Sequence, residues 1–135
     1  AICYSASHPM ASRIQMIQGP SIAPEIIEQV KTKASGRPRV LVCLDSKHTH
    51  DHVLTELEVY APLVSVGSYY IVFDTIIEDM PAEMFPDRPW GPGNNPKTAV
   101  WEFLKTHPEF EIDKQMDHKL LITVAPDGYL KRIGS

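Results

Sequence analysis

Two continuous apolar runs, each closed by an aspartate, constrain the fold of this chain more than any other feature. The runs are Val40–Leu44, followed by Asp45, and Tyr69–Phe73, followed by Asp74. A run that is apolar at every position is typical of a strand covered on both faces, as in a parallel sheet between two layers of helices. The segment Thr49–Tyr60 between the runs has helical apolar spacing. The order therefore predicts a strand–helix–strand unit with a right-handed crossover.

Further elements are expected on both sides of this unit. Short apolar or alternating segments predict strands, whereas cap residues followed by apolar stripes predict helices. The expected elements are a strand at Arg13–Ile17, a helix at Ser21–Ala34 capped by Ser21, a helix opened by Asn95 and Pro96, an antiparallel strand pair at Phe110–Asp113 and Leu120–Ala125, and a short extended end at Tyr129–Ile133. The predicted fold class is α/β in three layers, with a mostly parallel sheet and a carboxyl-terminal antiparallel strand pair.

Within the predicted helices, charged residues are expected to face solvent. Glu56 and Glu58 are placed outside the apolar stripe of Thr49–Tyr60, and Lys97 and Lys105 are placed on the surface of the later helix.

Size and charge exclude several classes of protein. The chain has 135 residues and a net charge of −4, which predicts a single domain over residues 1–135 and no nucleic-acid partner. No apolar stretch reaches the roughly 20 residues that cross a bilayer, and residues 1–9 lack the pattern of an export signal. Cys43 lies in an apolar run expected to be buried and Cys3 near the start, so no disulfide framework is expected. These features favour the cytoplasm.

The two aspartates form the first candidate site. Asp45 and Asp74 each follow the carboxyl end of a predicted parallel strand, where open α/β sheets bind ligands. Adjacent strands lie about 4.8 Å apart, so the carboxylates would repel unless a proton or a cation such as Mg²⁺ lies between them. The alternative is that both residues merely cap turns.

The histidines after Asp45 allow two hypotheses. The order His48, His50, Asp51, His52 is one residue short of the His-x-His-x-Asp-His motif of zinc hydrolases, and a deletion in a turn misplaces ligands. We therefore expect His50 and His52 to be exposed in the first turn of a helix. His48 lies three residues beyond Asp45, and its near-neutral ionisation suits a general base for a hydroxyl.

A long loop over residues 75–94 is rich in proline and glycine, which predicts a lid or binding loop without regular structure. Its polar residues are candidate substrate contacts, with a solvated loop as the alternative: Glu78, Asp79, Arg88 and Trp90. Gln18, Gly19 and Ser21 follow the first expected strand, where they could hold a nucleotide base or form a plain turn.

Four segments together resemble a known family. The strings LVCLDSKHTHDHV, LVSVGSYYIVFDT, FPDRPWGPGNNPKTAVWEFL and HKLLITVAPDGYLKRI are similar to the later blocks of the cephalosporin hydroxylase and rhamnosyl O-methyltransferase family. The resemblance runs from about Met10 to Ile133 and implies a Rossmann-like methyltransferase fold. It also implies methyl transfer from S-adenosylmethionine to a hydroxyl of a sugar or similar small molecule.

The resemblance assigns roles to individual residues. By similarity to the metal-assisted catechol type, Asp45 and Asp74 would hold a divalent metal such as Mg²⁺, and Thr75 stands where that type has an amide ligand. His48 stands where the catechol type has its lysine base. Gln18, Gly19 and Ser21 would contact the adenine of the cofactor, and Arg88 and Trp90 the acceptor.

The glycine-rich cofactor loop of the family has no counterpart in this chain. The resemblance is therefore to the carboxyl-terminal half of the family fold, truncated at its amino-terminal side. A sheet cut between strands exposes an apolar edge, which predicts a homo-oligomer. The expected interface residues are Met16, Ile17, Ile22 and Ile26. A catalytically silent, oligomeric interaction module derived from a methyltransferase is the alternative to an enzyme.

Overall fold

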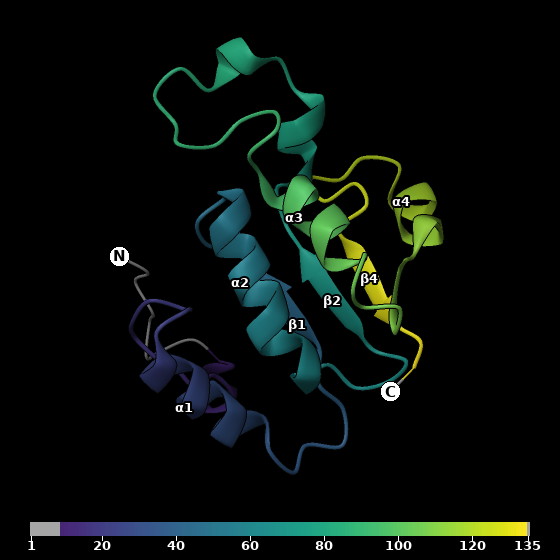
Figure 1. Ribbon diagram of the computed structural model, residues 1–135. Helices are drawn as coiled ribbons and strands as arrows, with labels where there is room; N and C mark the ends of the chain where they lie inside the picture. The colour runs from purple at the N-terminus through teal and green to yellow at the C-terminus, as the bar shows by residue number, and fades with distance from the viewer. Residues whose placement is uncertain (1–8, 135) are drawn as a thin grey trace.

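The predicted strand–helix–strand unit forms the centre of the fold. In the computed structural model, which describes residues 9–134, β1 (Val42–Leu44) and β2 (Tyr69–Val72) pair in parallel, with Leu44 opposite Val72. The helix α2 (His50–Tyr60) and a 3-10 turn at Ala61–Leu63 connect the two strands (Figure 1). The two continuous apolar runs thus become neighbouring parallel strands, as predicted.

The sheet has four strands in the order β1-β2-β4-β3. β4 (Tyr129–Arg132) pairs antiparallel with β2, and β3 (Phe110–Ile112) pairs antiparallel with β4. Only one of these pairings is parallel, so the expectation of a mostly parallel sheet is wrong for the described residues. The carboxyl-terminal antiparallel pair is present, but its second strand is β4.

The segment expected to supply that second strand, Leu120–Ala125, is not a strand. Helix α4 (Lys114–Leu120) ends there, and an irregular loop follows. Leu121 and Ile122 are 86% and 92% exposed, whereas Leu130 of β4 is fully buried. The apolar side chain that fills the core therefore comes from the segment after the turn at Asp127, and this segment takes the place beside β2.

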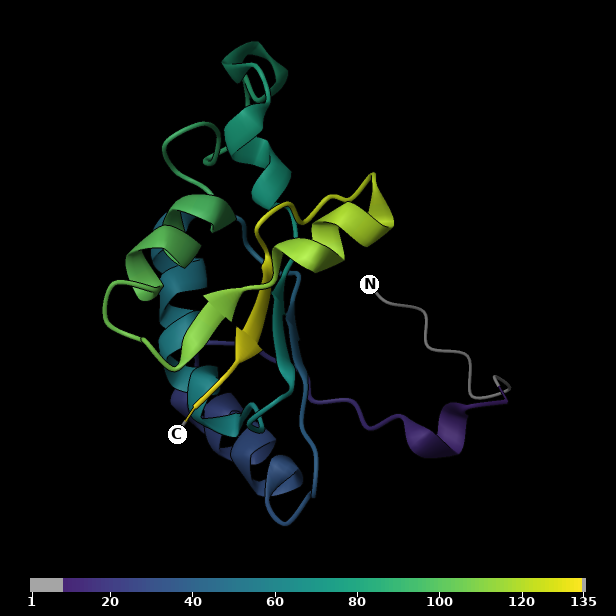
Figure 2. The same ribbon diagram turned by 90° about the vertical axis from the view of Figure 1, so that its right-hand side faces the viewer.

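Helices α2 and α3 (Pro96–Phe103) cover one face of the sheet and pack on each other (Figure 2). Helix α1 (Pro24–Ala34) lies on the same side, and Ile27 and Val30 pack against the core. The side chains that form the centre of this core are completely buried: Leu57, Tyr70, Val72, Val100, Phe103 and Leu130.

The opposite face of the sheet carries α4 (Figure 2). Cys43 is exposed as a free thiol, and the expectation that it is buried is wrong because its neighbour Leu44, which alternates with it along β1, is the one directed into the core. Cys3 lies outside the described residues. A full third layer remains a prediction.

The expected strand at Arg13–Ile17 does not form. A 3-10 turn at Ala11–Arg13 is followed by unpaired chain in which Ile14 and Met16 are 46% and 58% exposed. Within residues 9–134 no strand pairs with the outer edge of β1, and Arg13–Ile17 does not occupy that edge. Ile26 packs inside the chain at 7% exposure, which removes it from the predicted interface.

Helices α3 and α1 differ in the residue that precedes their first turn. Asn95 caps α3 as predicted, because its side chain accepts hydrogen bonds from the backbone of Lys97 and Thr98 in a capping box. Helix α1 instead begins after Ala23, without a side-chain cap, so the expected cap at Ser21 is wrong. No helix in the described part of the chain has both the length and the apolarity needed to cross a bilayer.

The loop over residues 75–94 contains more structure than predicted. Short 3-10 helices occupy Thr75–Asp79 and Ala82–Met84, and a bridge joins Gly91 to Asn94. The loop rises beyond the carboxyl ends of β1 and β2, at the top of Figure 1. It therefore overhangs the sheet edge where the candidate site was expected.

Candidate functional site

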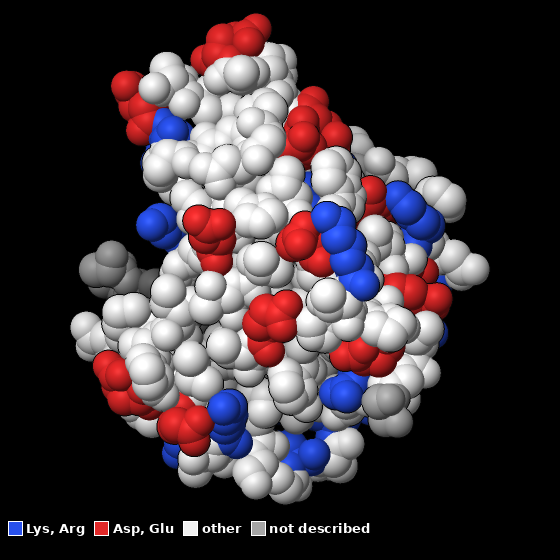
Figure 3. All heavy atoms as spheres, in the orientation of Figure 1, with Lys and Arg blue, Asp and Glu red and all other residues white. Residues whose placement is uncertain are grey.

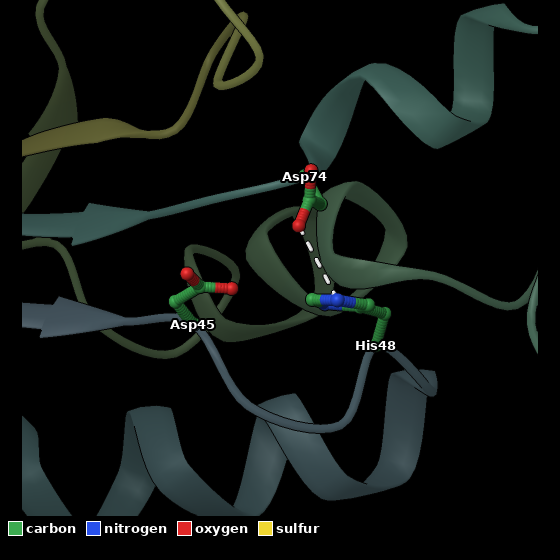
Figure 4. Close-up of side chains that lie close together, drawn as sticks. All are labelled: Asp45, His48 and Asp74. Atoms are coloured by element: carbon green, nitrogen blue, oxygen red, sulfur yellow. Dashed lines mark ion pairs between the residues drawn. The ribbon is translucent and has the colours of Figure 1, made fainter. Parts of the chain in front are cut away.

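Asp45, His48 and Asp74 converge at the carboxyl ends of β1 and β2 (Figure 4). Ligand atoms of the three side chains all lie within 4.8 Å of one another. His48 Nε2 is 3.3 Å from Asp74 Oδ2, and the His48 side chain is 18% exposed. The predicted placement of the two aspartates after adjacent parallel strands is confirmed.

The backbone explains how the cluster is positioned. The amide of Phe73 donates to the carbonyl of Leu44 at 3.0 Å, which continues the parallel ladder up to the residues before the aspartates. Asp74 then adopts a left-handed conformation with φ of 57°. This conformation is uncommon outside glycine, although aspartate and asparagine tolerate it better than other residues. A local backbone of this kind is often found at functional sites.

The donor set of the cluster fits a divalent cation. Two carboxylates and an imidazole offer oxygen and nitrogen ligands of the type that bind Mg²⁺, Mn²⁺ or Fe²⁺. Ligands on opposite sides of a Mg²⁺ ion lie about 4.2 Å apart, given ligand distances near 2.1 Å. The spread of at most 4.8 Å within the cluster is compatible with one ion after small side-chain movements.

A groove of about 500 Å³ opens beside the cluster. The Trp90 ring meets the His48 ring edge-on, with centroids 5.1 Å apart, and the Arg88 guanidinium lies 5.4 Å from the centre of the Trp90 ring. The structure thus places Trp90 next to His48 and brings both Arg88 and Trp90 into the lining of the same groove. The remaining lining is mainly apolar: Ile76, Ile77, Met80, Met84 and Phe85.

Glu78 and Asp79 were predicted to contact a substrate, but in the structure both form hydrogen bonds within the chain. Glu78 accepts hydrogen bonds from the backbone of Gly93, at 2.7 Å, and from the side chain of Asn95. Asp79 accepts a bond from Lys97 Nζ at 2.5 Å. Lys97 is only 5% exposed, so its expected place on the helix surface is wrong. These pairs fasten the long loop to the start of α3.

Thr75 is buried and donates its hydroxyl hydrogen to the carbonyl of Pro126 at 2.7 Å. The hydroxyl oxygen keeps lone pairs after this donation, so the predicted contact of Thr75 with a metal remains a prediction.

The other two histidines of the motif point elsewhere. His50 Nδ1 is 2.8 Å from the hydroxyl of Thr98, and His52 Nε2 is 3.2 Å from Ser21 Oγ. Both are partly buried, contrary to the expectation that they are exposed. Because only His48 joins the acidic cluster, the arrangement does not support a zinc site made by three histidines.

Of the three residues predicted to contact a nucleotide base, Ser21 lines a second cavity that also includes Asp45. This cavity has a volume of about 290 Å³, and its lining also includes Ser46, Glu56 and Tyr60. Gly19 has a φ of 151°, and a Cβ there would lie 2.5 Å from Ile26 Cδ1. The positive φ therefore favours glycine at this position, and any side chain there would displace Ile26, while Gln18 is exposed.

Glu56 is another charged residue whose burial the sequence pattern did not predict. It was expected to face solvent, but it is 1% exposed. Together with burial, its carboxylate raises the pKa of Tyr60 and Tyr70. The signal that was available is the spacing of His52, Glu56 and Tyr60, four residues apart along α2, which places the three polar groups on one face.

Acidic and basic side chains are interspersed on the face seen in Figure 3, and that part of the described surface has no continuous basic area.

Comparisons with known proteins agree with the resemblance. A family model described as rhamnosyl O-methyltransferase/CmcI matches residues 3–133. A rhamnosyl O-methyltransferase of Mycobacterium tuberculosis (strain H37Rv) is 31% identical over 134 residues, covering 96% of this chain and 52% of the relative. A protein of the same name from Mycobacterium leprae is 31% identical over 121 residues, covering 88% and 50%. The chain spans about half the length of these relatives. No solved structure matches it.

Proposed function

The chain belongs to the rhamnosyl O-methyltransferase/CmcI family, and we propose that it forms the acceptor side of an enzyme that methylates a hydroxyl of a sugar or similar small molecule. The observation that carries the proposal is the convergence of Asp45, His48 and Asp74 beside the groove that Trp90 lines. S-adenosylmethionine supplies the methyl group, whose bond to sulfur breaks as the acceptor oxygen bonds to the methyl carbon.

Each residue of the cluster has a part in this proposal. Asp45 and Asp74 hold a divalent cation, and the acceptor oxygen is oriented beside them. His48 takes the proton of the acceptor hydroxyl, and the imidazolium that forms is stabilised by the Asp74 carboxylate, whose Oδ2 lies 3.3 Å from the ring. His48 therefore acts as the base, and Asp74 both orients it and balances its charge.

The groove suggests what kind of acceptor is bound. The face of Trp90 and the guanidinium of Arg88 suit the apolar and polar sides of a sugar ring. Met80, Met84 and Phe85 offer apolar surface farther along the groove. We infer an acceptor whose reactive hydroxyl lies next to an apolar portion.

The donor side of the proposed site is the part that would hold S-adenosylmethionine, and it includes Ser21. Ser21 lies in the cavity that also reaches Asp45, which supports its proposed contact with adenine, with Gln18 and Gly19 as neighbours. A homo-oligomer remains part of the proposal, with Met16, Ile17 and Ile22 as its interface.

The test is methyl transfer from labelled S-adenosylmethionine to a panel of rhamnosides, measured on the purified protein. We expect His48→Gln to lower kcat by about 10²- to 10⁴-fold, the range for loss of a general base. Asp45→Asn should lower affinity for Mn²⁺ as well as kcat. Asp87→Asn, an exposed carboxylate on the long loop, is the matched control and should change neither.

Absence of transfer to every acceptor, together with self-association of the protein, would favour the catalytically silent interaction module instead.

A further inference from the structure

The Glu56 carboxylate is buried on the inner face of α2, and within residues 9–134 its ion pair is with His52 and not with a lysine or arginine. Glu56 borders a cavity whose other walls include Val30, Val42 and Leu44. Among the described residues, its side-chain partners are Ser46 and His52. Burying an acid is costly unless its oxygens are well bonded, and apolar side chains of similar size are often as stable there or more so. Packing alone therefore does not account for a glutamate at this position.

One contact of Glu56 reaches the candidate site. The Ser46 hydroxyl lies 2.8 Å from each of the two carboxylate oxygens. Ser46 follows Asp45 directly and precedes His48 by two residues in the loop after β1. The carboxylate thus holds this loop from the core side.

Other contacts of the same helix face reach the opposite side of the site. His52 Nε2 lies 3.5 Å from Glu56 Oε1 and 3.2 Å from Ser21 Oγ. The Tyr60 hydroxyl donates to the backbone carbonyl of Ser21 at 2.5 Å. We call His52, Glu56 and Tyr60 the α2 polar row. The row touches both the loop that bears His48 and the segment at Ser21.

The row is not a nucleophile-activating triad. In a serine–histidine–acid triad, the acid bonds one ring nitrogen and the serine the other. Here Ser21 and Glu56 both face Nε2 of His52. The geometry is that of a tether between segments.

We propose that Glu56 is a positioning residue that holds the Asp45–His48 loop through Ser46 and, as the centre of the α2 polar row, keeps this loop at a fixed distance from Ser21. The inference rests on the proposed function, in which the loop carries the base and a metal ligand and Ser21 lies on the donor side. Groups that orient metal ligands from behind commonly change metal affinity 10- to 100-fold when they are removed.

The test uses two readouts on the same variants. The first is Mn²⁺ affinity, measured by electron paramagnetic resonance. The second is the nuclear Overhauser contact between the His48 and Trp90 rings, which requires neither metal nor methyl transfer. We expect Glu56→Leu to weaken Mn²⁺ binding by about 10-fold and to weaken the ring contact. Ser46→Ala should act in the same direction.

Three further variants separate positioning from folding. Glu56→Gln keeps an oxygen that accepts a hydrogen bond from the Ser46 hydroxyl, so both readouts should have wild-type values. Glu58→Leu removes a carboxylate from the exposed side of the same helix and should leave both unchanged. The double variant Ser46→Ala, Glu56→Leu leaves no unpaired polar group between the two positions, so it should unfold no earlier than the wild type while its Mn²⁺ affinity stays low.

The outcomes are distinct. Wild-type values of both readouts in Glu56→Leu would overturn the inference, and so would an equal loss in Glu58→Leu. If the wild type binds no Mn²⁺, the metal assignment in the proposed function fails, and the ring contact alone decides whether Glu56 positions His48.

Discussion

The acceptor side and the donor side of the candidate site differ in how they are held. On the acceptor side, Phe103 and Val100 of α3 are completely buried, and Lys97 fastens the long loop through Asp79. On the donor side, Ile26 is the only buried residue of α1, and Met16 is 58% exposed. The acceptor side is therefore stabilised by packing of α3 into the core, whereas the donor side has fewer buried side chains.

The largest expected effect tests this difference in packing. Phe103→Ala should lower the free energy of unfolding by about 3–5 kcal/mol, because it removes a fully buried ring and leaves a cavity. Met16→Ala, the matched change on the donor side, should alter it by less than about 0.5 kcal/mol. Urea unfolding followed by circular dichroism measures both. Comparable losses in the two variants would break the comparison.

The next effect concerns the affinity of the chain for S-adenosylmethionine. We expect this chain alone to bind S-adenosylmethionine with a Kd of about 1 mM or weaker, since a glycine-rich loop for the cofactor is absent from its sequence. Calorimetric titration with and without Mg²⁺ measures this. A Kd near 1 μM corresponds to about −8 kcal/mol, and such a value would mean that the donor side holds the cofactor without further protein.

The smallest expected effect concerns one hydrogen bond at the start of α4, between Tyr69 and Asp113. The Tyr69 hydroxyl donates to Asp113 Oδ2 at 2.6 Å, which lowers the pKa of Asp113 and raises that of Tyr69. A lowered carboxyl pKa stabilises the fold above the unfolded value of about 3.9, and this contribution is lost as the pH falls through the folded pKa.

Tyr69→Phe should therefore lower Tm slightly at pH 7, and the difference from the wild type should shrink below about pH 4. Thermal unfolding across a pH series measures it. A difference that stays constant into strong acid would assign the effect to packing of the ring.

Parts of the fold were predictable where local pattern and tertiary environment agree. The run ending at Asp74 became a central strand in which Tyr70 and Val72 are buried, and the run ending at Asp45 pairs with it at the edge of the described sheet. Arg13–Ile17 and Leu120–Ala125 have similar local character but form no strand. A strand requires a neighbour with free hydrogen-bonding groups, and a segment's own sequence does not contain that neighbour.

Some residues of the candidate site were predictable from the sequence and others were not. Asp45, His48 and Asp74 follow from the rule that parallel strands end at one edge of a sheet, so their convergence was predictable. Glu56 was misplaced because helical periodicity assigns charged residues to solvent by their chemistry alone. Its burial depends on Ser46, which a single-helix pattern does not include.

The left-handed backbone of Asp74 has a consequence for directed evolution of this chain. Glycine adopts that conformation with little cost, so replacing Asp74 would relieve backbone strain of the order of 1 kcal/mol. A library selected only for heat resistance should therefore accumulate glycine at position 74, whereas one selected for methyl transfer should retain the aspartate. Divergence of the two populations at this codon would separate the demands of the fold from those of the chemistry.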